Sequence, residues 1–223
     1  MNFTTGAGLK GTGTAGSGYL YTGGLADWRI VGIGDVNGDG IPDLVFQNGA
    51  GQVYAWFLNG SGSPVNFTTG AGLKGTGAAG SGYLYPGGLA DWRIVGIADV
   101  NGDGKQDLIF QNSAGQVYAW FLSGTGSTVN FTTGAGIKGT GAAGSGYLYS
   151  GALGDWRIAG IGDVNGDGVP DLVFQNNAGQ IYQWFLNGTG SPVNLATGAG
   201  LKRAGAAGSG YLYPGGLSDW RVR

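Results

Sequence analysis

Apolar and polar residues follow the same order several times along the chain, at a constant spacing. The pattern is marked by tryptophan and asparagine residues that recur every 64 positions: Trp28, Trp92, Trp156 and Trp220, and Asn2, Asn66, Asn130 and Asn194. A fixed period of this kind indicates a repeat architecture in which each copy is one structural unit. We therefore divide residues 1–223 into a single array, with a partial repeat at 1–27, full repeats at 28–91, 92–155 and 156–219, and the start of another at 220–223.

The first half of each repeat carries the stronger strand signals. In the first full copy, the pattern predicts strands over Arg29 to Gly34, Leu44 to Gln47 and Gln52 to Leu58, and Asn48 to Gly51 supply the turn residues of a hairpin. Along Gln52 to Leu58, both sets of alternating residues from Val53 onward are apolar, so each face of the strand is apolar. A strand buried on both faces belongs to a sheet stacked between two others, as in a propeller blade.

The second half of each repeat is rich in glycine and predicts less. Val65-Asn66-Phe67 and Tyr83-Leu84-Tyr85 are candidate short strands, and residues 70–82 between them are expected to form a long loop. No apolar period of 3.6 residues is sustained anywhere, so helices should be few or absent. The pattern as a whole predicts an all-β chain.

Composition narrows the possible functions. The chain has 52 glycines and 27 aromatic residues, which suits many short strands joined by tight turns. It contains no histidine, cysteine or glutamate, which excludes Ser-His-Asp and Cys-His catalysis, thiolate or imidazole metal sites, and disulfides. We therefore expect no enzyme. A net charge of −2 gives no reason to expect a nucleic-acid partner.

Neither a signal peptide nor a membrane span is expected. Residues Met1 to Lys10 have no basic region followed by an apolar run, as a secretory signal would. The apolar runs are only a few residues long, which is too short for a transmembrane helix. We expect no insertion into a membrane.

The acidic residues are concentrated in three loops. All 13 are aspartates, and nine lie in the segments 35–43, 99–107 and 163–171, each of the form D-x-N-G-D-G-x-x-D. Three carboxylates and one carboxamide within nine residues repel one another unless a cation is present, and calcium prefers six to eight oxygen ligands. Asp, Asn and Gly also build ordinary turns that bind nothing. Three full copies in a chain that spends few acids elsewhere favour binding.

The loops therefore predict three calcium sites of a structural kind. Positions 1, 3, 5 and 9 offer side-chain oxygens and position 7 offers a backbone carbonyl. The predicted ligands are Asp35, Asn37, Asp39, Ile41 and Asp43; Asp99, Asn101, Asp103, Lys105 and Asp107; and Asp163, Asn165, Asp167, Val169 and Asp171. An EF-hand is not expected, because Phe46 stands where its loop needs glutamate and the flanking segments are strands.

These residues resemble the FG-GAP and VCBS family of calcium-loop repeats. The resemblance runs through Trp92-Arg-Ile-Val-Gly, Asp99 to Asp107, Leu108-Ile-Phe and Trp120-Phe-Leu-Ser-Gly124, and covers about half of each repeat. It implies four-stranded propeller blades in which the calcium loop joins the first two strands. Such repeats occur in integrin-α-like adhesion propellers, in some fungal lectins and in large bacterial surface proteins. The alternative architecture is an open stack of β-repeats.

Aromatic residues provide a candidate ligand site. Sugars bind where an aromatic face meets a few fixed polar groups, and clefts between blades offer that geometry. The best local cluster is Tyr83, Tyr85 and Trp92, with Asp91 and Arg93 nearby. Aromatic residues at repeat spacing more often fill the spaces between blades, and Asp91 and Arg93 could form only a local ion pair.

Two further motifs carry little weight. Residues 75–80 spell G-x-G-x-x-G, but Gly-Ser-Gly follows instead of a helix, so a dinucleotide site is not expected. Several N-x-S/T triplets matter only if the chain passes through a glycosylating secretory route.

The functional hypothesis is a non-enzymatic, calcium-stabilised propeller-type module that binds carbohydrate and is secreted or held at the cell surface. The alternative is a structural or scaffold protein, designed or part of an extracellular fibre, whose main partner is itself. Three calcium-loop halves cannot close a ring, because propellers need four to eight blades. We therefore expect a homo-oligomer, either a two-chain ring of six blades or an open fibre.

Overall fold

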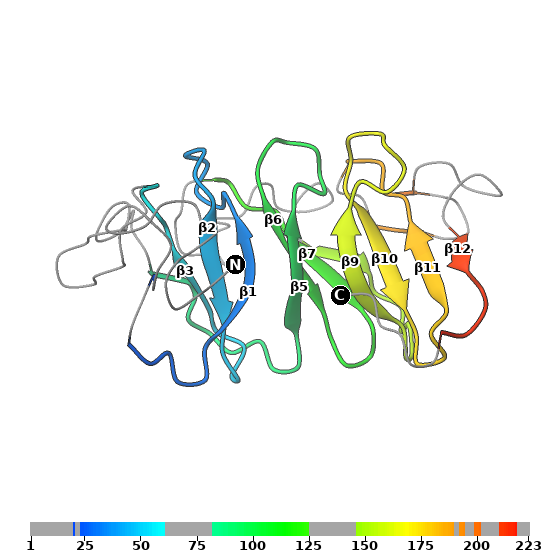
Figure 1. Cartoon of the computed structure of the whole chain (residues 1–223), viewed down its shortest axis with the longest axis horizontal. Coiled ribbons are helices and arrows are strands. Elements are labelled where there is room, and N and C mark those ends of the chain that lie inside the picture. Colours follow the sequence, from blue (N-terminus) through cyan, green and yellow to red (C-terminus); the bar gives the residue numbers. More distant parts are fainter. Residues whose placement is uncertain are drawn as a thin grey trace, which may run out of the picture.

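The computed structural model describes residues 20, 23–60, 82–124, 146–189, 192–194, 199–201 and 210–217. Within these residues the chain forms three antiparallel sheets of four strands each and no helix (Figure 1). Blade 1 contains β1 (Arg29–Gly34), β2 (Asp43–Gln47), β3 (Val53–Trp56) and β4 (Gly82–Tyr85); blade 2 contains β5 (Arg93–Ala98), β6 (Asp107–Gln111), β7 (Val117–Trp120) and β8 (Gly146–Tyr149); blade 3 contains β9 (Arg157–Gly162), β10 (Asp171–Gln175), β11 (Ile181–Trp184) and β12 (Gly210–Tyr213). The prediction of an all-β fold with tandem four-stranded repeats is confirmed.

The hairpin between β2 and β3 forms as its turn residues predict. The Gly51 amide donates to the Asn48 carbonyl at 3.0 Å, and the Gln52 amide donates to Asn48 Oδ1 at 2.9 Å. Gly51 has a φ of 84°, a left-handed conformation that favours glycine. The same turn recurs at Gly115 and Gly179, so each blade has the same strand register.

Each blade is a meander in which neighbours in sequence pair with each other. The predicted strand at Tyr83 to Tyr85 is confirmed as β4, which pairs with β3. The candidate strand at Val65 to Phe67 lies outside the described residues, as does nearly all of the expected loop at 70–82. Strand boundaries in the first half of the repeat agree with the prediction to within two residues.

The hydrophobic core lies between the blades. Each blade presents one face, here called the back face, to the next blade, and the opposite front face to the blade before it. Phe57 and Leu84 on the back face of blade 1 pack with Phe110 and Trp120 on the front face of blade 2. Blades 2 and 3 meet in the same way. Burial on both faces of the third strand is therefore confirmed, and neighbouring blades stabilise each other.

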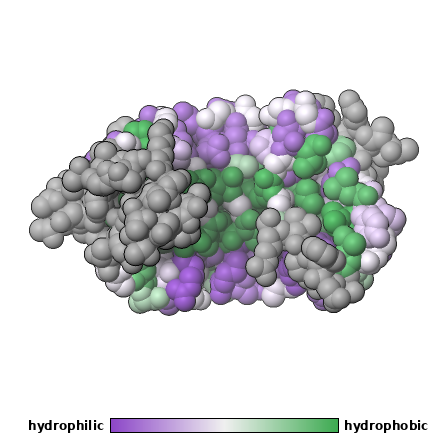
Figure 2. Space-filling view, viewed as in Figure 1, coloured by the Kyte–Doolittle hydropathy of each residue, from purple (hydrophilic) through white to green (hydrophobic). Residues whose placement is uncertain are grey.

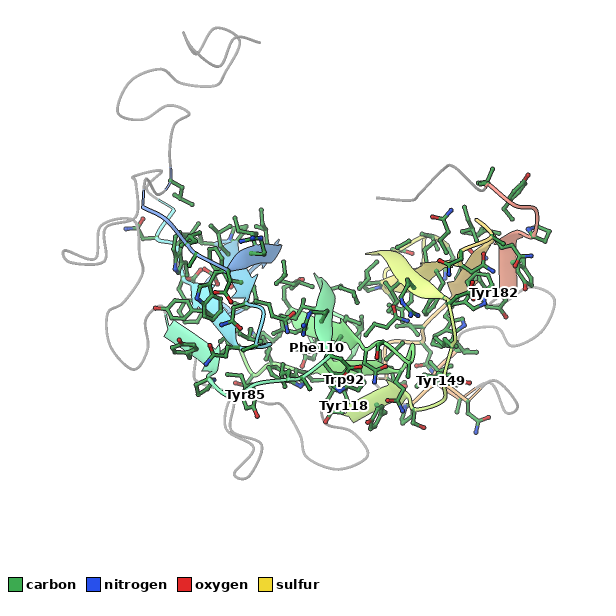
Figure 3. The ribbon with its side chains drawn as sticks, turned by 90° about the horizontal axis from the view of Figure 1, so that it is seen from below. Tyr85, Trp92, Phe110, Tyr118, Tyr149 and Tyr182 are labelled. Carbon is green, nitrogen blue, oxygen red and sulfur yellow. The ribbon has the colours of Figure 1, made fainter. Side chains whose placement is uncertain are left out.

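The three blades follow an arc, with β1, β5 and β9 on its concave side (Figure 3). These inner strands approach each other closely. A Cβ atom added at Gly32 would lie only 2.5 Å from Ile97 Cδ1, so any larger residue there would force the isoleucine side chain to shift. Gln47 links blades 1 and 2: its Nε2 atom donates to the Trp92 carbonyl at 3.1 Å, and its Oε1 atom accepts from the Ile94 amide at 2.9 Å. Hydrophobic side chains form a band across the middle of this side, between hydrophilic ends (Figure 2).

Candidate calcium loops and aromatic pockets

Each blade carries one aspartate loop, and the three loops lie at the same edge of their blades. They join β1 to β2, β5 to β6 and β9 to β10, and all three stand at the top of Figure 1. Strands flank each loop on both sides, as the sequence predicts. The repeat therefore places three copies of the same acidic loop side by side.

The first aspartate of each loop holds the loop backbone. Asp35 Oδ1 accepts hydrogen bonds from the Gly38 amide at 2.7 Å and the Asp39 amide at 3.0 Å, and Oδ2 accepts one from the Gly40 amide at 2.7 Å. Gly38 and Gly40 have φ angles of 78° and 85°. Asp163 makes the same three bonds in the third loop. The curled loop is thus formed by its own side chains and amides.

The last aspartate of each loop is buried in the blade. Asp43, Asp107 and Asp171 are fully inaccessible to solvent. Asp43 accepts hydrogen bonds from the Val36 amide at 3.2 Å and the Leu58 amide at 3.0 Å, which tie the loop to the end of β3. Burial, together with the neighbouring loop aspartates, raises the pKa of Asp43 to about 7 and that of Asp107 to about 8, although the amide hydrogen bonds act in the opposite direction. A nearby cation would favour the ionised form.

The middle aspartate also points inward. Asp39 Oδ1 accepts from the Ile41 amide at 2.8 Å, while its Oδ2 atom is buried and has no hydrogen-bond partner. The Oδ2 atoms of Asp103 and Asp167 share this state. Among the described residues, which include all three loops, no three carboxylates converge as a finished metal cage. Instead, the loop carboxylates accept hydrogen bonds from backbone amides, most of them within the loop itself.

The residues of each loop fit calcium in their chemistry. All the predicted donors are oxygen atoms, the ligands that a hard cation prefers, and the buried oxygen of the middle aspartate is available to one. The ion would have to draw the carboxylates together against their mutual repulsion. Asp35, Asp39 and Asp43 would hold it in loop 1, with Asn37 and the Ile41 carbonyl.

Three aromatic pockets form a second repeated feature. Each is lined by six residues at the same repeat positions, and the volumes are about 170, 180 and 230 Å³ in blades 1, 2 and 3. The linings are Leu25, Trp28, Phe46, Tyr54, Trp56 and Tyr83; Leu89, Trp92, Phe110, Tyr118, Trp120 and Tyr147; and Leu153, Trp156, Phe174, Tyr182, Trp184 and Tyr211. Figure 3 shows Trp92, Phe110 and Tyr118 together in the middle blade.

Ring contacts fix the shape of each pocket. In blade 1, Trp28 lies 5.9 Å from both Tyr54 and Tyr83, measured between ring centroids, and the two tyrosines are 5.1 Å apart. Burial raises the pKa of Tyr54, and the neighbouring Tyr83 raises it further, so the Tyr54 phenol is neutral at pH 7. Tyr83 is 41% exposed at the rim. The pocket combines aromatic faces with phenolic hydroxyl groups.

The predicted ligand cluster is divided between different places. Tyr83 lines the pocket of blade 1, whereas Trp92 lines that of blade 2. Tyr85 packs edge-on against Trp120 of the next blade, with centroids 5.5 Å apart. Asp91 accepts hydrogen bonds from the amide and hydroxyl of Ser113.

Arg93 also has a structural contact. Its Nη2 atom donates to the Gly49 carbonyl of the preceding blade at 3.3 Å. Sequence reasoning did not assign Tyr54, Tyr118 and Tyr182 to a site, although the alternation along the third strand places Tyr54 and Trp56 on one face.

Comparison with known families agrees with this geometry. The family described as FG-GAP repeat matches residues 28–56 and 92–120, which span the first three strands of blades 1 and 2 together with their acidic loops. No curated protein matches the chain. Blade 3 repeats the same strand order and loop 64 residues further on. Blades 1 and 2 therefore contain FG-GAP-type repeats of the β-propeller kind.

Proposed function

We propose that the chain is a non-enzymatic, calcium-stabilised binding module whose ligand is a carbohydrate. The observation that carries this proposal is the threefold recurrence of one aromatic pocket, built each time from the same six repeat positions. Pockets for drug-sized ligands enclose roughly 300–1,000 Å³. The smaller volumes here suit a single sugar ring, whose apolar face stacks on Trp28 while Tyr54 and Tyr83 offer hydroxyl partners.

Calcium has a structural role in this proposal. Trp28 precedes β1 and the acidic loop follows it, so the pocket and the loop lie toward opposite ends of that strand. An ion in the loop would not touch the ligand. It would instead neutralise the buried Asp43 and hold β1, β2 and the end of β3 together. The residues that line the three pockets include no carboxylate, imidazole, thiol or amine, the side chains that most often carry acid–base catalysis.

A glycan array followed by calorimetry, both in millimolar calcium, tests the ligand. We expect weak binding of a monosaccharide, loss of binding in the triple variant Tyr83→Ala, Tyr147→Ala, Tyr211→Ala, and partial retention in the matched Tyr→Phe triple variant, which keeps the rings. Absence of binding to any glycan by the native chain would remove carbohydrate from the proposal.

Thermal unfolding in EDTA and in calcium tests the ion separately. Each occupied site stabilises the folded state by about 2.7 kcal/mol at a hundredfold excess over the dissociation constant. We expect a clear rise of Tm with calcium, lost in the triple variant Asp39→Asn, Asp103→Asn, Asp167→Asn. The exposed Asp27, outside the loops, provides the control substitution Asp27→Asn. Identical unfolding with calcium and with EDTA would contradict the calcium proposal.

A secreted or cell-surface location belongs to the same proposal. FG-GAP repeats typically occur in extracellular or surface proteins, where calcium is abundant. In the part of the chain that the structure describes, no helix is long and apolar enough to cross a membrane. Fractionation of the native source tests this location, and we expect to detect the protein outside the cells.

The scaffold role is the second candidate function. It is favoured by the large apolar side chains exposed on blades 1 and 3, among them Ile30, Ile33 and Leu212. A chain that binds no glycan and forms regular particles in electron micrographs would support this role instead.

A further inference from the structure

Among the described residues, the two outer blades each leave one face open. Inside the chain, the front face of one blade covers the back face of the blade before it, once between blades 1 and 2 and again between blades 2 and 3. The front face of blade 1 and the back face of blade 3 are the same two surfaces without that partner. Their uncovered parts can be compared with the covered copies position by position.

Exposure at equivalent positions measures how open these faces are. On the front face, Ile94 is 6% exposed whereas Ile30 is 55% exposed. On the back face, Leu84 is 2% exposed whereas Leu212 is 52% exposed. Val164 is likewise 49% exposed, against 2% for its counterparts in the other blades. Parts of both open faces, around Ile30 on the front face and around Val164 and Leu212 on the back face, therefore expose residues whose counterparts are buried in the internal interfaces.

The inner strands supply a steric match. Ile97 packs over Gly32, and Ile161 packs over Gly96, where an added Cβ atom would come within 2.5 and 2.4 Å of the isoleucine. The next glycine in this series is Gly160, which has nothing within 4 Å of an added Cβ atom. The isoleucine at the start of the series is Ile33, which is 65% exposed. Blade 3 thus has open space over Gly160, and blade 1 has an exposed isoleucine, Ile33, of the kind that fills this space between the other blades.

Arginine contacts supply a polar match. Arg93 Nη2 donates to the Gly49 carbonyl at 3.3 Å, and Arg157 Nη2 donates to the Ser113 carbonyl at 2.9 Å, each across a blade boundary. The equivalent carbonyl on blade 3 belongs to Asn177, which lines a cavity of about 230 Å³ with Gln175 and Asn176. The equivalent arginine on the open front face is Arg29.

We propose that the front face of blade 1 binds the back face of blade 3 of a second copy of this chain. Ile33 of one copy packs over Gly160 of the other, and Arg29 donates to the Asn177 carbonyl. A second copy is the partner because these two surfaces already fit each other twice within one chain. This interface goes beyond the proposed ligand-binding function and does not depend on it.

The arc of the blades gives the expected assembly. Repeating the internal contact continues the curve seen in Figure 3, and two chains of three blades make six, within the four to eight of known propellers. Leu20 already packs against Leu44, Phe46 and Trp56 on the front face. The second copy therefore contacts chiefly the inner part of this face, around Ile30 and Ile33.

Sedimentation and light scattering of the full chain test the proposal with two variants. The native chain should have about twice the single-chain mass of 22.5 kDa at micromolar concentration. Ile33→Asp damages only the front face and Gly160→Val only the back face. Each should raise the dissociation constant about hundredfold or more, because a carboxylate would be buried or the gap filled. Gly146→Val in β8 also has open space around it and serves as the control.

Mixing the two variants provides the decisive measurement. Each variant keeps one intact face, so the mixture should form a dimer of one Ile33→Asp chain and one Gly160→Val chain, although neither variant dimerises alone. A symmetric front-to-front contact would instead leave Gly160→Val unaffected and overturn the proposal. So would a monomeric native chain at 100 micromolar, or association that survives both substitutions. Larger species abolished by the same two substitutions would keep the interface and replace the ring by a fibre.

Discussion

The middle blade and the outer blades have nearly the same sequence but different surroundings. Ile94 in blade 2 is buried, and Ile30 at the same position in blade 1 is exposed. Leu148 is buried in blade 2, while Leu212 in blade 3 is exposed. The local fold is the same in each pair, since the strands and their register recur. The stability of a blade therefore depends on its neighbours, as expected for repeats that contact only adjacent copies.

A buried charge gives the largest expected difference between these regions. Both substitutions are compared in chains that also carry Gly160→Val, so that the open faces are unpaired in both. Ile94→Asp should destabilise the chain by about 4–5 kcal/mol, because the new carboxylate would lie unpaired between blades. Ile30→Asp should change the free energy of unfolding by about 0.5 kcal/mol or less. Urea unfolding followed by tryptophan fluorescence measures both, and equal losses would contradict the comparison.

Stability without calcium should depend on pH through the buried loop carboxyls. The pKa of Asp107 is raised to about 8 by burial, above that of the unfolded chain, so the folded state retains its proton more strongly. Stability is therefore greatest near pH 4 and falls by several kcal/mol as the pH rises toward 8. Unfolding curves in EDTA should show this fall.

Substitutions and calcium sharpen this test. Asp107→Asn should remove a large part of the pH dependence, and Asp171→Asn a smaller part, because the adjoining Val164 is half exposed and water reaches the third loop. Calcium should oppose the fall, since it binds the ionised carboxyls. Stability that instead rises from pH 4 to pH 8 in EDTA would show that these carboxyls are ionised in the folded chain.

Truncation of an outer-strand leucine should have an intermediate effect. Leu84→Ala leaves a cavity between blades 1 and 2 and should cost about 3 kcal/mol. Leu212→Ala, in the same Gly160→Val background, should cost less than about 1 kcal/mol because its side chain is half exposed. Leu84→Met, which roughly preserves volume, is the control and should cost less than Leu84→Ala. A similar loss for both alanine variants would mean that blade 3 is covered in the single chain.

The smallest expected effect concerns a contact that differs between blades 1 and 2. Ser113 stands where blade 1 has Gly49, and its hydroxyl and amide donate to Asp91. These bonds hold the pKa of Asp91 below its usual value. Ser113→Gly should raise that pKa while leaving the fold unchanged. A carboxyl-carbon NMR titration measures it, and an unaltered Asp91 curve would exclude the hydroxyl bond.

The sequence by itself determined the repeat, the strands and the loops. Apolar alternation along Gln52 to Leu58 and the Asn48 to Gly51 turn are local signals, because backbone conformation and hairpin geometry depend on neighbouring residues. The acidic loops were equally visible, since their residues are contiguous. The aromatic residues were also visible, but their grouping was not: adjacency in sequence placed Tyr83 with Trp92, and the blades separate them.

Only the tertiary structure decided which apolar faces are covered. Identical residues at equivalent positions, such as Leu84 and Leu212, have the same local pattern and differ only in what packs against them. Likewise Tyr54 meets Trp28 and Tyr83 because strand pairing brings together residues 26 and 29 positions away. Burial is a property of contacts between distant parts of the chain, and a repeating sequence cannot distinguish a blade in the middle of the array from one at its edge.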